Sequence, residues 1–210
     1  MSREAILNSV RSALGRTAGQ PIPPPPPVWL HAQDWPLEVR LASFREKLER
    51  LSGVMHEAAS QAEAHDIVEG LIAGKTAIAS NAPLLVDLGI SSLPNVQTAG
   101  NGGSPLRALC ATCEFGITSA AFALAATGTL VMRASPLEPR MVSLLPPIHI
   151  AIVPKELLLV DLDELLTLTP KPLEDTSSMV FITGPSRTGD IEQFLVRGVH
   201  GPGVVHVIFL

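Results

Sequence analysis

The chain contains the stretch Met179-Val180-Phe181-Ile182-Thr183-Gly184-Pro185-Ser186-Arg187-Thr188-Gly189-Asp190-Ile191-Glu192, which carries its clearest local signal. Residues 179–182 are an apolar run typical of a buried strand, and the chain then turns at Gly184. Thr188 is a residue type that caps helices, so we expect a helix to start there and to continue over residues 191–197. A strand followed by a turn and a helix is a building unit of α/β domains.

The rest of the chain repeats this alternation of strands and helices. Apolar residues spaced three and four apart predict a helix over residues 37–51, and Ser60 with Glu63 forms a capping box before a second helix that Gly74 ends. Strands are expected at residues 54–58, 76–80, 129–133, 148–153 and 204–210. Strands that alternate with helices favour a parallel sheet, so we predict an α/β domain over residues 37–210.

Residues 1–36 differ in composition from this domain, and we predict that they form a separate arm. Residues 2–14 show an amphipathic helical pattern, and five consecutive prolines begin at Pro23. Such a run enters neither a helix nor a sheet and is typical of an extended polyproline II segment. It suits a stiff strap over a surface or, alternatively, a peptide ligand for a partner protein.

The charge and hydropathy of the chain argue against several classes of function. The formal net charge is −5 and the 15 lysine and arginine residues are scattered, so we expect no nucleic-acid partner. The apolar stretch at residues 120–126 is far shorter than the roughly 18 residues that a membrane span needs. The N-terminal residues lack the apolar core of a signal peptide. We therefore expect a cytoplasmic protein without a membrane span.

The turn after residue 182 is the first candidate for a ligand site, because ligands of α/β domains bind beyond the carboxyl ends of strands. The chain turns at Gly184, Ser186 and Thr188 offer hydroxyl donors, and Arg187 can hold a carboxylate or phosphate through two hydrogen bonds. The free N–H groups of a helix start would add to this attraction. The alternative is that Thr188 only caps the helix. We predict that the segment binds a small anionic molecule.

Four further residues are weaker candidates. Glu114 could act as a nucleophile or general base, with a solvated loop carboxylate as the alternative. Thr118 is expected to cap an apolar, buried helix within residues 116–126 and so to face a crevice. Arg133 is a second donor for an anion. His149 lies in an apolar strand and suits either a hydrogen-bonded core position or a pocket that uses a side chain titrating near neutrality.

Cys110 and Cys113 are the two cysteines of the sequence and form one Cys-x-x-Cys pair. One such pair is half of a zinc site and half of a usual iron–sulfur ligand set, and its neighbours give no thioredoxin-like context. We interpret both as structural or incidental thiols, with a redox or metal role as the alternative. We therefore expect this chain to hold no metal or cofactor of its own.

Several groups of residues form a pattern that known proteins share. They are Gly116-Ile117-Thr118 with Thr127-Gly128-Thr129, Ser143-Leu144-Leu145-Pro146 with His149-Ile150-Ala151-Ile152-Val153, and residues 183–192, completed by Val199-His200-Gly201-Pro202. Together they resemble the LUD-domain family of lactate-utilisation proteins, over roughly residues 38–210. The resemblance implies a Rossmann-like parallel-sheet domain of the NagB/RpiA/CoA-transferase-like type, preceded here by the helical and Pro-rich arm.

The same resemblance implies a function and partners. Members of the family act with an iron–sulfur subunit and a third subunit to oxidise L-lactate to pyruvate. The chain is then expected to be one component of a lactate-oxidising complex, with the iron–sulfur cluster in a partner protein. Two other hypotheses stay open. One is a stand-alone transferase or isomerase for a CoA- or phosphate-bearing substrate, with Glu114 as the transferase nucleophile. The other is a non-catalytic assembly or sensing subunit.

Overall fold

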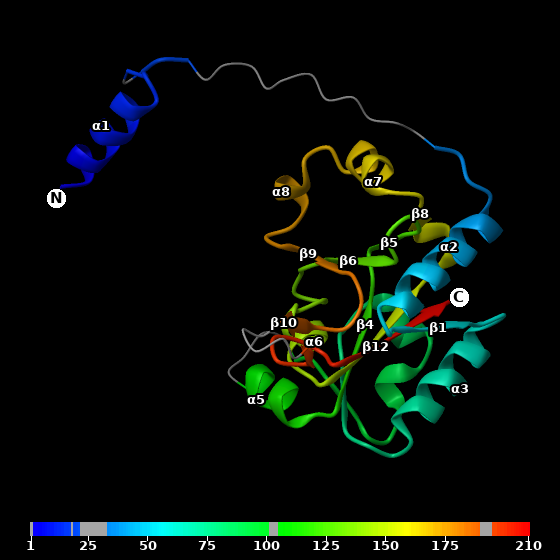
Figure 1. Ribbon diagram of the computed structural model, residues 1–210. Coiled ribbons are helices and arrows are strands. Elements are labelled where there is room, and N and C mark those ends of the chain that lie inside the picture. The colour runs from blue at the N-terminus through cyan, green and yellow to red at the C-terminus, as the bar shows by residue number, and fades with distance from the viewer. Residues whose placement is uncertain (1, 18, 22–32, 101–104, 190–194) are drawn as a thin grey trace. The chain divides into compact units, whose positions relative to one another are not determined.

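The computed structural model describes residues 2–17, 19–21, 33–100, 105–189 and 195–210 (Figure 1). The chain forms two compact units, Met1–Leu30 and His31–Leu210. In the first unit, helix α1 (Arg3–Ala13) is capped by Ser2, whose hydroxyl accepts a hydrogen bond from the N–H of Ala5 at 3.2 Å. None of the α1 residues is buried, so the apolar stripe of this helix is exposed.

A six-stranded parallel sheet forms the centre of the second unit, with the strand order β1-β12-β7-β4-β2-β3 (Figure 1). Every neighbouring pair in it is parallel, and the register places Ile150 between Ile117 of one neighbour and His206 of the other. The strands are β1 (Val54–Glu57), β2 (Ala77–Ala79), β3 (Val96–Thr98), β4 (Phe115–Ser119), β7 (Ile148–Val153) and β12 (Val204–Phe209).

Helices cover one face of this sheet at α3 (Gln61–Ile72), α4 (Pro83–Asp87) and the short 3-10 turn η1 (Ile90–Ser92). Successive side chains of a strand point to opposite faces, so Ile150 and Ile152 reach this layer together. The predicted cap of α3 is confirmed at Ser60, whose hydroxyl accepts from the Glu63 N–H, while the Glu63 carboxylate reaches one residue beyond the cap and accepts from the N–H of Ala59.

The other face of the sheet is covered by more varied elements. Helix α2 (Leu37–Arg50) packs there with a second, four-stranded sheet in the order β8-β5-β6-β9. Helices α5 (Pro105–Thr112) and α6 (Met141–Leu144) cover the part of this face that carries Ile78. The remaining strands are β5 (Phe122–Leu124), β6 (Thr129–Arg133), β8 (Leu158–Leu159), β9 (Met179–Ile182), β10 (Arg187–Gly189) and β11 (Leu195–Arg197). The turn η2 (Lys155–Leu157) and helices α7 (Leu162–Leu168) and α8 (Pro172–Asp175) connect them.

The helix predicted within residues 116–126 is wrong. The strand β4 runs through this segment to Ser119, and β5 follows it at Phe122. Four of the five β4 residues are buried, so the segment lacks the alternation of a half-exposed strand and its sequence resembles that of a buried helix. Thr118 is a strand residue and caps no helix.

The helix predicted to start at Thr188 is also wrong in the part of the chain that the structure describes. β10 and β11 form an antiparallel ladder in which Thr188 pairs with Val196. Residues 190–194, between them, lie outside the described residues. The preceding strand β9 belongs to the smaller sheet, where it pairs antiparallel with β6.

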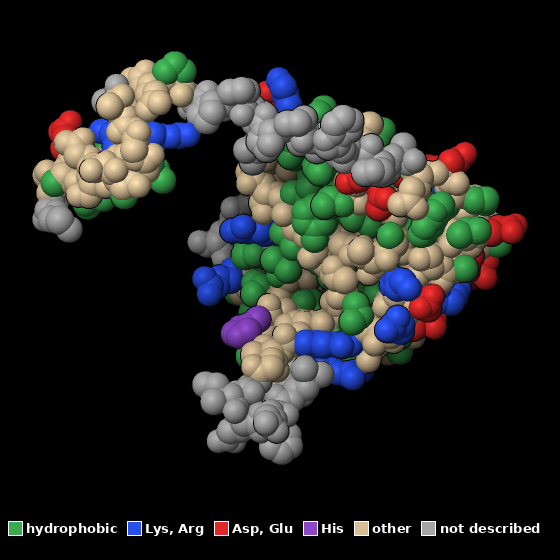
Figure 2. Space-filling model, turned by 45° about the horizontal axis from the view of Figure 1, so that its top comes forward, with side chains coloured by type: hydrophobic (Ala, Val, Ile, Leu, Met, Phe, Trp, Pro, Cys, Tyr) green, Lys and Arg blue, Asp and Glu red, His purple; other side chains and the backbone are tan. Residues whose placement is uncertain are grey.

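The α/β class and the parallel central sheet are confirmed, whereas the specific NagB/RpiA/CoA-transferase-like type stays a prediction. Among the described helices, none combines the length and apolar character that crossing a lipid bilayer requires. On the face drawn in Figure 2, acidic and basic side chains lie interspersed with apolar ones.

Gly116 allows α6 to pack directly against the backbone of β4. A Cβ atom at Gly116 would lie 1.9 Å from the Val142 carbonyl oxygen, well inside van der Waals contact. We expect Gly116→Ala to lower the free energy of unfolding by roughly 1–3 kcal/mol or more, because a backbone atom must move. Gly70→Ala on α3 is the matched control, since nothing lies within 4 Å of its Cβ position. Because alanine favours a helix more than glycine does, this change should raise the free energy of unfolding by about 0.5–1 kcal/mol. Urea unfolding measures both, and equal stability of the two variants would contradict the packing described.

Candidate functional site

The connections of the central sheet reverse direction between β2 and β4. From β2 the chain continues to β3 on one side, whereas from β4 the next strand of this sheet is β7 on the other side. The loops at the carboxyl ends of these two adjacent strands therefore diverge. In open parallel sheets, ligands bind outside the carboxyl ends of strands at such a switch point.

Four polar residues lie at this point, and we call them the crest cluster: Ser80, Asn81, Ser119 and Glu138. Ser80 and Asn81 follow β2 directly, Ser119 ends β4, and Glu138 comes from the loop of residues 134–140 between β6 and α6. The Ser119 N–H and hydroxyl both donate to Glu138 Oε1 at 2.8 Å. The N–H of Asn81 donates to the Leu137 carbonyl at 2.9 Å, so both strand ends hold the same loop.

Burial raises the pKa of the Glu138 carboxyl, although the hydrogen bonds from Ser119 and a smaller contribution from the Ser80 hydroxyl oppose the rise. The Ser80 hydroxyl is fully buried and has no described partner at hydrogen-bonding geometry, even though it lies near enough to affect this pKa. A carboxyl with a raised pKa at a switch point suits general acid–base chemistry. The alternative role is mechanical, because the same carboxylate ties the loop to β4.

The crest cluster has no motif in the sequence that marks it as a site. Glu138 sits among loop residues between two prolines, and its partner Ser119 is 19 positions away in the chain. One signal was present, namely polar residues placed directly after the buried run at 76–80.

Thr118 and His149, two of the predicted site residues, do lie together. The Thr118 hydroxyl and His149 Nε2 are 2.8 Å apart, and His149 is fully buried. Burial lowers the pKa of His149 to about 4, so the ring is neutral at physiological pH. Its Nδ1 atom is buried and has no hydrogen-bond partner among the described residues. Thr118 alternates with Ser119 along β4, so these two side chains point to opposite faces of the sheet.

Arg133 and Glu114 each form an ion pair with a neighbour. Arg133 Nη2 lies 3.1 Å from Asp175, and Glu114 lies 3.2 Å from the Lys75 ammonium. Glu114 directly precedes β4 and is half-exposed, so it lies at the amino edge of the sheet, at the other end of β4 from Ser119. The structure therefore separates Glu114 from the switch point; its catalytic role stays a prediction.

The turn after β9 lies at the amino edge of the central sheet, not at the carboxyl edge where it was expected. Gly184 packs on Leu51, and the Arg187 guanidinium donates a hydrogen bond to the Leu51 carbonyl. The N–H of Ser186 donates to the Pro202 carbonyl at 2.8 Å. Leu51 lies just before the start of β1, and Pro202 lies just before the start of β12. These contacts therefore place the turn at the amino edge of the sheet.

A ligand role for Gly184, Ser186, Arg187 and Thr188 thus stays a prediction, without the helix start that was expected to support it. Arg187 is exposed, and its contact with a backbone carbonyl leaves further N–H donors on the guanidinium.

The two cysteines do not suit an iron–sulfur cluster in this chain. Cys110 and Cys113 are free, buried thiols on and just after α5. Burial raises the pKa of both thiols, that of Cys110 to about 11, which disfavours the thiolate that a cluster needs. A usual cluster also takes four cysteine ligands, and the sequence has two cysteines.

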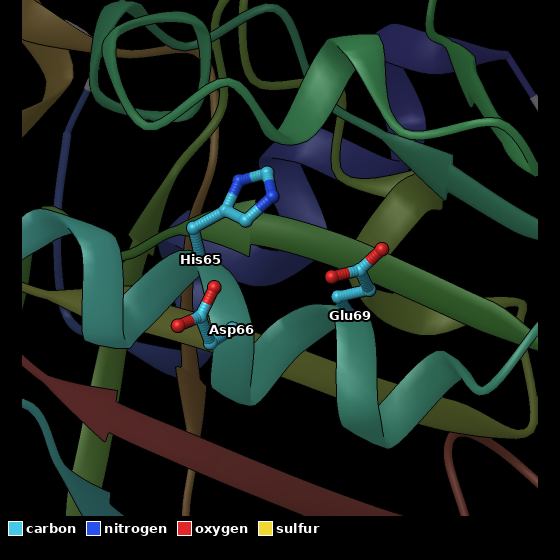
Figure 3. Close-up of side chains that lie close together, drawn as sticks. All are labelled: His65, Asp66 and Glu69. Atoms are coloured by element: carbon cyan, nitrogen blue, oxygen red, sulfur yellow. The ribbon is translucent and has the colours of Figure 1, made fainter.

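One group of potential metal ligands occurs in the part of the chain that the structure describes: His65, Asp66 and Glu69 on α3 (Figure 3). Their ligand atoms lie within 4.8 Å of one another, but both carboxylates are exposed. Figure 3 shows the imidazole and the Asp66 carboxylate leaving the helix in different directions. His65 Nδ1 donates to the Leu88 carbonyl at 2.9 Å, which already gives the ring a structural role.

Comparison with known proteins places the chain among relatives that share a name. A family model described as the LUD domain matches residues 41–210. The lactate utilization protein C of Exiguobacterium sp. is 42% identical over 100 residues, which are 46% of this chain and 44% of that protein. For the Bacillus licheniformis protein of the same name the values are 40% over 93 residues, 42% and 39%. These two alignments span less than half the length of the relatives.

A longer alignment and a solved structure complete the comparison. Lactate utilization protein C 1 of Bacillus mycoides is 30% identical over 224 residues, covering 96% of this chain and 93% of that protein. The crystal structure of a DUF162 family protein from Deinococcus radiodurans superposes with a TM-score of 0.63, covering 84% of this chain and 99% of that one. At 18% sequence identity this likeness shows the fold alone.

We expect Glu138→Gln to become more stable relative to the wild type as the pH rises. The folded-state pKa of Glu138 is raised, so the unfolded chain releases this proton at a lower pH than the folded chain does. As the pH rises from the unfolded-state pKa to the folded-state pKa, the free energy of unfolding of the wild type therefore falls. The glutamine side chain of the variant has no charge to desolvate, and its oxygen can still accept the hydrogen bonds from Ser119, so the variant does not lose this stability. Urea unfolding from about pH 4 to pH 8 measures the difference. Glu114→Gln, at the opposite edge, is the control; a Glu138→Gln advantage that shrinks with rising pH would overturn the assignment.

Proposed function

We propose that this chain, which belongs to the LUD domain family, takes part in lactate utilisation, and that it acts through the crest cluster. The relatives named lactate utilization protein C support this role, and one of them aligns over 96% of the chain. The single structural observation that carries the site assignment is the part-buried Glu138 carboxyl, bonded to Ser119 at the switch point of the sheet.

The chemistry of lactate oxidation gives this carboxyl a task. Conversion of L-lactate to pyruvate breaks the O–H and C2–H bonds and forms the C=O bond, so that one proton leaves the hydroxyl group while the C2 hydrogen and the two electrons leave toward an acceptor. A carboxylate whose pKa is raised by burial accepts such a proton more readily than an ordinary glutamate does. We therefore assign Glu138 the role of proton acceptor, held in position by Ser119.

The two electrons need an acceptor outside this chain. Because Cys110 and Cys113 do not suit a cluster, we propose that an iron–sulfur partner receives the electrons, within a complex of more than one subunit. The anionic small molecule that the sequence placed at residues 183–192 is proposed here on the loop of residues 134–140 instead, because the turn after β9 lies at the other edge of the sheet.

The proposal is tested by growth on L-lactate in the organism of origin, after its other lactate dehydrogenases have been deleted. Deletion of this chain should abolish growth on L-lactate and leave growth on pyruvate intact. The wild-type gene and Glu49→Gln, a change at an exposed residue of α2, should restore growth, whereas Glu138→Gln should not, although the variant folds. Normal growth on L-lactate without the chain would remove the proposed function. Growth supported by Glu138→Gln would remove only the assignment of the proton acceptor.

A further inference from the structure

A pocket with a volume of about 500 Å³ lies beside the start of α6, on the same loop that carries Glu138. Its walls come from the loop before α6 and from the segment that leads into β9. They are formed by Ala134, Pro139, Arg140, Met141, Ser177 and Ser178.

Hydrogen bonds across the pocket hold its two walls together. The N–H of Ala134 donates to the Ser178 carbonyl at 2.9 Å. The hydroxyl of Thr176, which is buried, lies 2.7 Å from the Ala134 carbonyl oxygen and 2.9 Å from that of Ser178. The pocket is therefore formed before any ligand arrives, which lowers the entropic cost of binding.

The polar groups of the pocket suit an anion. Arg140 is exposed and forms no ion pair with any residue that the structure describes, and no acidic residue is among the six that line the pocket. The neighbouring Arg133, by contrast, is neutralised by Asp175 at 3.1 Å. The hydroxyls of Ser177 and Ser178 likewise make no hydrogen bond within the described part of the chain, so they are available as donors.

The other three residues that line the pocket are apolar. Ala134, Pro139 and Met141 offer aliphatic surface next to the guanidinium. A guanidinium binds a carboxylate through two parallel hydrogen bonds, and a hydroxyl can donate to an adjacent oxygen while an aliphatic wall takes a methyl group. A short 2-hydroxy or 2-oxo acid presents these three groups on neighbouring carbons.

We propose that this pocket binds the carboxylate of a short 2-hydroxy or 2-oxo acid, with Arg140 as the residue that holds the carboxylate and Ser177 and Ser178 as donors to the neighbouring oxygen. The inference rests on the proposed function and deepens it, because it assigns the ligand class to the loop that also carries Glu138. Arg140 lines the pocket and Glu138 does not, but the two residues come from the same loop, 134–140.

Calorimetry on the purified full chain tests the proposal, with sodium L-lactate, pyruvate, phosphate and chloride compared at equal ionic strength. L-lactate or pyruvate should bind the wild type. Arg140→Gln should raise the dissociation constant by about 10- to 100-fold, as expected for a lost charge-assisted contact. Arg107→Gln, an exposed arginine of α5 outside the pocket, is the matched control and should bind as the wild type does. Ser177→Ala should weaken binding less than Arg140→Gln.

Three outcomes would overturn the inference: equal affinity of Arg140→Gln and Arg107→Gln, binding of phosphate but of neither carboxylate, or no heat with any carboxylate. Unfolding of Arg140→Gln without ligand is measured first, and a surface change of this kind should leave it unaltered. If growth on L-lactate needs the chain while no carboxylate binds at Arg140, this inference fails and the proposed function stands. If L-lactate binds but growth without the chain is normal, the proposed function fails instead.

Discussion

One carboxylate oxygen joins the loop of residues 134–140 to the end of β4. Glu138 Oε1 accepts from both the N–H and the hydroxyl of Ser119, the last residue of β4. Hydrogen bonds to a charged group contribute roughly 1.5–3 kcal/mol each, yet the pKa of Glu138 is still raised, so the cost of desolvating the charge exceeds the gain from these bonds. A neutral glutamine would hold the loop as well. A carboxyl retained where it costs stability points to a chemical task, as is common at functional sites.

The position of this loop depends in turn on close packing beneath it. Gly116 lets α6 rest on the β4 backbone, and the loop enters α6 at Arg140. From the other side, the N–H of Asn81 holds the loop through the Leu137 carbonyl. Glu138 and the pocket around Arg140 are thus fixed by the ends of β2 and β4 and by the α6 contact, all on rigid parts of the fold. A site built on such elements keeps its geometry better than one on a free loop.

Sequence periodicity predicted those strands of the central sheet that are apolar runs ending at turn residues, whereas β3 was not predicted and β4 lies in the segment predicted as a helix. The runs at residues 76–80, 148–153 and 204–210 became β2, β7 and β12, and the helix over residues 37–51 became α2. The segment 116–126 was wrongly predicted as a helix because a strand that is buried on both faces has no alternation of apolar and polar residues to identify it. Thr188 misled because threonine suits a strand as well as a helix cap, and here it pairs with Val196 in an antiparallel ladder.

The candidate site was predicted less well than the fold, since its residues meet only through tertiary contacts. Thr118 and His149 were named separately and are joined across 31 positions of the chain. Glu138 was passed over as one loop residue, and the turn after β9 could not be assigned to either edge of the sheet without knowing that β9 belongs to the smaller sheet.

Carbon-13 NMR titration of the Glu138 side-chain carboxyl, assigned by comparison with Glu138→Gln, measures whether this part-buried group is ready to accept a proton. Its pKa should lie above the ordinary value for glutamate and should change further when L-lactate is added. A carboxyl that titrates at or below the ordinary value and does not respond to L-lactate would contradict the assignment of Glu138 as the proton acceptor.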